Sequence, residues 1–147
     1  LKWGILGAGT IILSGDIHIL CMVRFFLIRR YILFPGDWSD FLAKMSKASM
    51  KYDLILTSET IYEEVNYYKL LSIFEQLLEP NGLILLAAKI HYFGVGGGLR
   101  SFEKNLPESK WTFRTVFENS DSVKREIIEI KRKSWYKKPK PRILFSR

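Results

Sequence analysis

Glu59 and Tyr62 stand three residues apart, directly after the apolar segment 52–57. A carboxylate in this place can act as a general base, and the pair can hold or desolvate a nucleophile beside an electrophile. Ser58 precedes them with a hydroxyl, although such a hydroxyl can equally cap a helix. Short motifs of this kind are weak signals when taken singly. The segment nevertheless predicts a candidate catalytic pair, Glu59 and Tyr62.

Two further polar clusters also follow apolar segments. Asp37, after Gly36, can accept a hydrogen bond from an adenine amino group while Trp38 stacks on the ring. A third cluster at 89–92 leads into the glycine-rich segment 94–98. The plainer alternatives are a simple turn, an indole that covers the core, and glycines that only permit positive φ. Because ligands of open α/β sheets sit outside the carboxyl ends of the strands, three such clusters together favour one binding site.

The elements that must position these clusters alternate along the chain. Apolar runs predict buried strands at 31–34, 52–57 and 83–88, and the spacing of leucines predicts an amphipathic helix over 66–79. Helices over 39–47 and 99–105 and two antiparallel strands, 111–118 and 123–131, complete the order. This order predicts an α/β fold with a mostly parallel sheet and a carboxyl-terminal antiparallel hairpin.

Local signals fix several details of these elements. Ser39 is expected to cap the helix 39–47, whose inner face would carry Phe41, Leu42 and Met45. Pro80-Asn81-Gly82 is expected to stop the long helix and turn the chain. Trp111, Phe113, Thr115 and Phe117 alternate with polar neighbours, which predicts a half-buried strand.

Charge and composition exclude some classes of protein. The 147 residues carry a formal net charge of +8. Residues 1–123 hold 13 basic and 13 acidic side chains, whereas 124–147 hold 10 basic and 2 acidic, so the whole excess is at the carboxyl end. The single cysteine excludes a disulfide framework and fits the reducing cytoplasm or nucleus. Charges interrupt the apolar segment 1–34, so no membrane span is expected.

Other catalytic signatures are not found in the sequence. There is no metal-binding constellation, no Gly-x-Ser-x-Gly elbow and no phosphate-loop lysine. Gly7 and Gly9 near the start would let a cofactor approach the backbone closely, but a bare Gly-x-Gly motif has little specificity.

Three stretches carry a more specific resemblance: Phe34–Phe41, Tyr52–Tyr62 and Leu86–Gly98. In this order they resemble the histidine protein methyltransferase family, which has the seven-strand, Rossmann-like class I methyltransferase fold. The resemblance covers about 34–131. It implies transfer of a methyl group from S-adenosyl-L-methionine to a histidine ring nitrogen of a protein, typically a ribosomal one, by a monomeric enzyme.

The resemblance also implies roles for individual residues. Gly36, Asp37 and Trp38 would sit at the adenine end of the cofactor, with Ser58 near its methionine part. Glu59 and Tyr62 would face the incoming imidazole, and the carboxylate would fix its tautomer. Gly7 and Gly9 would border the cofactor.

The amino-terminal third departs from the family pattern. No acidic residue precedes Gly7 and Gly9, and only 21 residues separate Gly9 from Tyr31, whereas one strand–helix–strand unit takes about 30. We therefore expect an incomplete copy, with a partial methyltransferase domain at 1–131 and a basic, disordered tail at 132–147.

Two alternative functions stay open. One is an inactive remnant that serves as an RNA- or ribosome-associated interaction module, because Trp135 and Tyr136 lie among the lysines of the tail. The other, less favoured, is an interfacial membrane segment at 19–34.

Overall fold

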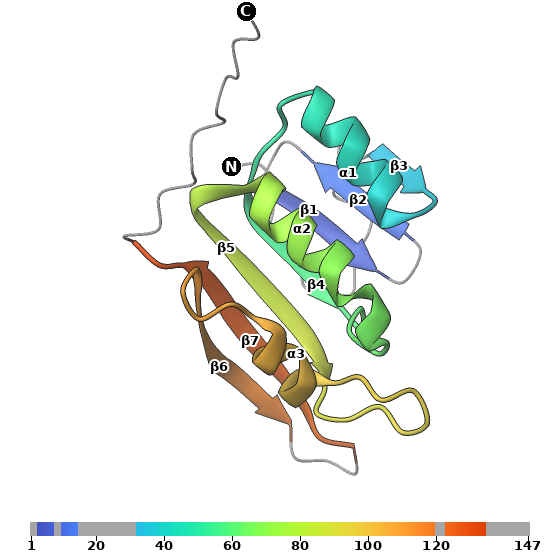
Figure 1. Cartoon of the computed structure of the whole chain (residues 1–147), viewed down its shortest axis with the longest axis vertical. Coiled ribbons are helices and arrows are strands. Elements are labelled where there is room, and N and C mark those ends of the chain that lie inside the picture. Colours follow the sequence, from blue (N-terminus) through green and yellow to red (C-terminus); the bar gives the residue numbers. More distant parts are fainter. Residues whose placement is uncertain (1–2, 8–9, 15–31, 120–122, 135–147) are drawn as a thin grey trace, which may run out of the picture.

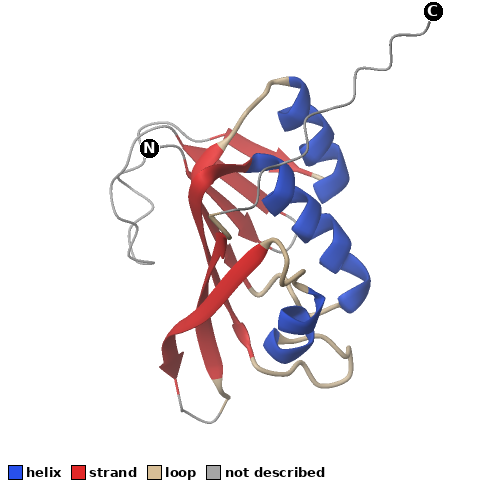
Figure 2. Cartoon of the chain, turned by 60° about the vertical axis from the view of Figure 1, so that its left-hand side comes forward, coloured by secondary structure: helices blue, strands red, loops and turns tan. Residues whose placement is uncertain are grey.

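The computed structural model describes residues 3–7, 10–14, 32–119 and 123–134. One mixed sheet forms the body of the protein, and the three α-helices lie together on one of its faces (Figures 1 and 2). In chain order the elements are β1 (Trp3–Gly7), β2 (Thr10–Ser14), β3 (Ile32–Pro35), α1 (Trp38–Lys47), β4 (Tyr52–Ser58), α2 (Tyr67–Leu77), β5 (Leu78–Lys89), α3 (Leu99–Asn105), β6 (Trp111–Asn119) and β7 (Arg125–Arg132). A 3₁₀ turn, Glu64–Asn66, precedes α2.

The seven strands are arranged in the order β3-β2-β1-β4-β5-β7-β6. β4 pairs in parallel with β1 and with β5, and the other four pairings are antiparallel. Five strands therefore run one way, and only β2 and β7 run the other way. The predicted α/β class and the carboxyl-terminal hairpin β6–β7 are confirmed. The close antiparallel hairpin β1–β2, in which Gly7 pairs with Thr10, was not predicted.

Helix α1 begins one residue earlier than expected, so the predicted N-cap, Ser39, is wrong. Asp37, not Ser39, is the N-cap: its carboxylate accepts a hydrogen bond from the backbone N–H of Ser39 at 2.7 Å. The predicted inner face is confirmed, since Phe41 and Met45 are buried. Phe34 at the end of β3 packs edge-on against Phe41, with 5.5 Å between the ring centres. β3 is the edge strand of the sheet; of the strand expected at 31–34, Phe34 is half-buried against the core, and the next residue, Pro35, is exposed.

Helix α2 and strand β5 follow one another without a turn. The helix buries Leu70, Ile73, Phe74 and Leu77 and ends at Leu77. The helix stops before Pro80, as predicted, but the segment 80–82 is a bulge inside β5, skipped by the pairing with β4, and not a turn between two elements. Arg132 in β7 donates to the carbonyl oxygens of Phe74 (3.0 Å) and Glu75 (2.7 Å). An arginine from another strand thus stabilises the end of α2, where carbonyls lack helical partners.

Strand β6 is more exposed than its alternating pattern predicted. Trp111 is buried and contacts Phe74 edge-on, but Phe113 is 41% and Phe117 56% exposed. As the last strand of the sheet, β6 has a neighbour on one side only. Alternation indicates two faces but not whether anything covers them. In the part of the chain that the structure describes, no helix is long and apolar enough to cross a membrane.

Candidate functional site

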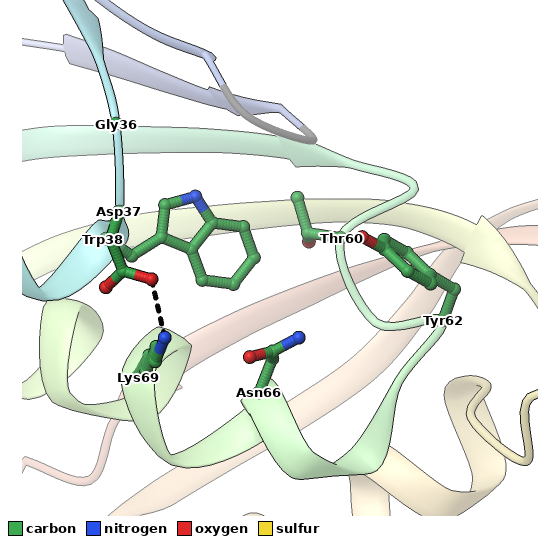
Figure 3. Close-up of a pocket in the computed structure, with 7 residues that line it drawn as sticks. All are labelled: Gly36, Asp37, Trp38, Thr60, Tyr62, Asn66 and Lys69. Carbon is green, nitrogen blue, oxygen red and sulfur yellow. Dashed lines mark hydrogen bonds and ion pairs between the residues drawn. The ribbon is translucent and has the colours of Figure 1, made fainter.

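A small cleft opens between the start of α1, the segment after β4 and the start of α2. Figure 3 shows its seven lining residues: Gly36, Asp37, Trp38, Thr60, Tyr62, Asn66 and Lys69. Three of them, Gly36, Asp37 and Trp38, come from the predicted adenine-end cluster, and Tyr62 comes from the predicted catalytic pair. The structure therefore brings two of the three sequence clusters to the wall of one cleft.

Asp37 is the acidic group of this cleft. Its carboxylate accepts a hydrogen bond from the Lys69 ammonium at 2.6 Å and is nearly half exposed. The hydrogen bond from Lys69, followed by those from Ser39, lowers the pKa of Asp37 to about 2. Asp37 is therefore an ionised, acceptor-only group at any physiological pH. Such a group can accept a hydrogen bond from an exocyclic amine.

Trp38 supplies the flat apolar wall. The indole is half-buried against the core and extends across the cleft towards Thr60 (Figure 3). Thr60 is itself buried, and its hydroxyl shares a 2.6 Å hydrogen bond with that of Thr57. The indole covers the core and lines the cleft, so the two readings of Trp38 from the sequence are compatible.

Glu59 belongs to a second, adjoining cluster. Its backbone has φ of 54°, a left-handed conformation that is rare outside glycine, and its N–H donates to Ala87 O at 2.9 Å. The carboxylate accepts a 2.8 Å hydrogen bond from the hydroxyl of Tyr92 and lies 3.7 Å from Arg125 Nε. Tyr62 connects the cluster to the cleft, because its ring meets that of Tyr92 edge-on at 6.4 Å.

The remaining predicted site residues that the structure describes do not line the cleft. Ser58 is the exposed last residue of β4 and does not line the cleft. Gly7 ends β1, and because Leu6 pairs with Thr57, Gly7 comes level with Ser58 at the same edge of the sheet. Gly9 lies outside the described residues. Gly94, Gly96 and Gly98 have positive φ, as the plainer reading of the glycine-rich segment predicted.

Four residues of the two clusters were given no role from the sequence. Lys69 and Asn66 lie three residues apart at the start of α2, so helical spacing places them on one face. Arg125 reaches Glu59 because β7 pairs with β5, where Arg125 lies opposite Lys89. Tyr92 was noticed only as part of its cluster. Among the described residues, no group of three or more potential ligands could hold a metal ion.

Comparisons with known proteins extend these observations. Residues 33–103 match a family model described as lysine methyltransferase. "Histidine protein methyltransferase 1 homolog" of Bos taurus is 43% identical over 76% of this chain and 29% of the relative. The Mus musculus protein of the same name is 46% identical over 67% of this chain, a match that covers 28% of the mouse protein. The Dictyostelium discoideum protein of that name is 39% identical over 72% of this chain, a match that covers 35% of the relative.

Over the residues matched, the chain is therefore similar in sequence to methyltransferases. More narrowly, the matches confirm the resemblance to the histidine protein methyltransferases that the sequence motifs predicted. The chain spans about three tenths of the length of these relatives. A solved structure described as a methyltransferase complexed with SAH overlays with a TM-score of 0.45 at 18% identity, over 65% of this chain and 30% of that one.

Proposed function

We propose that this chain takes part in S-adenosyl-L-methionine-dependent methylation of a histidine ring nitrogen in a protein. The names of relatives 39–46% identical to it support this reaction. The observation that carries the proposal is the convergence of Asp37, Trp38 and Tyr62 on one cleft, beside Glu59. A ribosomal protein as the substrate, a monomeric state, and a location in the cytoplasm or nucleus belong to the same proposal.

The residues of the cleft fit the adenine end of the cofactor. The ionised Asp37 can accept a hydrogen bond from the adenine amine, and the indole of Trp38 offers a stacking face. The cleft holds about 140 Å³, whereas sites that enclose a whole drug-sized ligand hold roughly 300–1,000 Å³. The described residues therefore suit one end of the cofactor, and Gly7 and Ser58 at the neighbouring strand ends are the candidates for contacts with the rest.

The residues of the second cluster fit the handling of an imidazole. When bound, the cofactor supplies a methyl group on a positively charged sulfur. Glu59 accepts the N–H of the target imidazole, which leaves the lone pair of the other ring nitrogen free to attack. After methylation, the same carboxylate oxygen can take up the N–H proton. Tyr62 lines the cleft and packs against Tyr92, the partner of Glu59, so its ring is the candidate to exclude water and help orient the imidazole.

Two measurements test the proposal in sequence. Calorimetry with S-adenosylhomocysteine tests the cleft, and no detectable heat at millimolar ligand would contradict cofactor binding. Incubation with radiolabelled S-adenosylmethionine and histidine-containing peptides, followed by acid hydrolysis, then tests for methylhistidine. Binding without methylhistidine would favour the alternative of an inactive interaction module.

A further inference from the structure

We propose that Tyr92 is a positioning residue that orients the Glu59 carboxylate and so selects which ring nitrogen of the target histidine is methylated. This inference rests on the proposed function. It names a residue of the segment after β5 to which the sequence motifs assigned no role.

Glu59 is fixed at its backbone but not along its side chain. The left-handed φ and the bond to Ala87 O hold the main chain at the end of β4. Left-handed backbone at a non-glycine residue costs energy and is found preferentially at functional sites. The side chain is 42% exposed. A flexible carboxylate at that exposure needs a side-chain partner to keep one orientation.

Tyr92 provides that partner, and its proton can point only one way. The hydroxyl accepts the backbone N–H of Lys89 at 3.3 Å and lies 2.8 Å from Glu59 Oε2. A phenol has a single proton, and a carboxylate can only accept, so the proton is directed at Glu59. Burial, then the hydrogen bond to Glu59, raises the pKa of Tyr92, so this donor keeps its proton at neutral pH.

The loop that carries Tyr92 is seated on the segment after β4. The N–H of Tyr92 donates to Gly97 O at 3.0 Å, and the N–H of Gly97 donates to Tyr62 O at 3.2 Å. A Cβ at position 97 would lie 2.4 Å from the carbonyl oxygens of Ile61 and Tyr62, so only glycine fits this approach. The Lys89 ammonium lies 5.4 Å from the centre of the Tyr92 ring. Tyr92 is therefore held independently of Glu59.

The two oxygens of Glu59 consequently differ. Oε2 is engaged by Tyr92, whereas Oε1 lies 3.7 Å from Arg125 Nε, which is longer than a hydrogen bond. An imidazole N–H approaching Glu59 would thus meet Oε1 in an orientation that Tyr92 sets. Because the N–H that binds the carboxylate determines which nitrogen keeps the lone pair, the position of Oε1 relative to the methyl donor determines the isomer formed.

The first arm of the test needs no activity. In the chain labelled with ¹³Cζ-tyrosine, the Tyr92 resonance should move at neutral pH when Glu59→Gln is introduced, because a charged acceptor is replaced by a neutral one. The exposed Tyr68 is the internal control and should not move. An unchanged Tyr92 resonance would overturn the proposal, whether or not the chain transfers methyl groups.

The second arm measures the products. Tyr92→Phe keeps the ring and removes the hydroxyl. It should lower kcat about tenfold, in keeping with the loss of one hydrogen bond to a charged group, and should change the ratio of the two methylhistidine isomers. The affinity for S-adenosylhomocysteine and the KM for the peptide should stay unchanged, and the control Tyr68→Phe should match the parent chain.

The outcomes separate the two proposals. A parent chain that gives no methylhistidine contradicts the proposed function, and the resonance of Tyr92 then decides the positioning role alone. If the parent chain is active, an unchanged kcat and isomer ratio in Tyr92→Phe would overturn the role of Tyr92. A parallel fall in cofactor affinity and melting temperature would indicate a purely structural residue and would overturn it too.

Discussion

Asp37 and Glu59 are both carboxylates that follow a strand, yet their partners differ in kind. Asp37 is paired with a lysine ammonium whose side chain comes from a helix, and the carboxylate is nearly half exposed. Glu59 is bonded to the hydroxyl of a half-buried tyrosine that is itself fixed at its backbone, its ring and its hydroxyl. An exposed ion pair is weak and screened by salt, and either partner can exchange it for a ligand.

The difference indicates how each site is used. The Asp37–Lys69 pair keeps an acceptor charged and ready for a ligand that displaces or joins the lysine. The Glu59–Tyr92 bond keeps an acceptor in place, as orientation during a reaction requires. Variants that weaken binding should therefore belong to the first cluster, and variants that slow turnover should belong to the second.

The largest effect is expected from Glu59→Gln. Removing a general base typically lowers turnover by about 10²-fold or more, so methylhistidine formation should fall by that factor. The affinity for S-adenosylhomocysteine should remain within about twofold, because Glu59 does not line the cleft. A large loss of affinity, measured by calorimetry, would remove the distinction between the two clusters.

Asp37→Asn should have a smaller effect, on binding. Asparagine still caps α1, so the helix is kept while the charge is lost. We expect about tenfold weaker binding of S-adenosylhomocysteine, with no change in kcat at saturating cofactor. Asp40→Asn in the first turn of the same helix is the matched control. Equal losses in both variants would show that helix stability, not adenine contact, had been measured.

Lys69→Met should change the pH dependence of binding more than the affinity at neutral pH. Lys69 is the main cause of the low Asp37 pKa, which is about 2. A depressed carboxylate pKa preserves the charged form as pH falls, and without Lys69 the pKa should return towards 3.8. Cofactor affinity should therefore decline at a higher pH in the variant. Titrations between about pH 2 and 5, the range that spans the two pKa values, check this, and superimposable profiles would contradict it.

The smallest effect on the site is expected from deleting 135–147. These residues lie outside the described part of the chain and hold five basic side chains. The affinity for S-adenosylhomocysteine should not change. RNA binding over a salt series tests the alternative of an interaction module, because a tail that contacts phosphates should lower the salt slope when it is removed. An unchanged slope would leave the tail without that role.

The sequence predicted those parts of the fold that depend on local pattern. The period of the apolar residues indicated α1, α2 and β4 to within about two residues, and the polar residues after the strands indicated the site. The partners of those polar residues could not be predicted. Arg125 reaches Glu59 only because β7 pairs in one register with β5, which brings together residues 66 positions apart.

The sequence also could not show which faces of the sheet are covered by helices. The alternation of Phe113 and Phe117 is the same whether or not a helix packs on them, and in this fold both are exposed. The segment 80–82 has the composition of a turn, yet it lies within β5 as a bulge, between Leu78, which pairs with Tyr52, and Leu83, which pairs with Leu54. In both cases the tertiary surroundings, which a local pattern does not reveal, decide the outcome.

The close packing of Gly97 against the segment after β4 limits which substitutions this loop can accept. Any side chain at that position would wedge the loop away from Ile61 and Tyr62. Tyr92 would move with the loop, and Glu59 would lose its donor, although residue 97 touches neither carboxylate nor substrate. The tips of the loop at Phe93 and Val95 are exposed and can change freely. Substitution of the buried Gly97 is therefore expected to impair the chemistry from a distance, whereas substitutions at the exposed Phe93 and Val95 are expected to be tolerated.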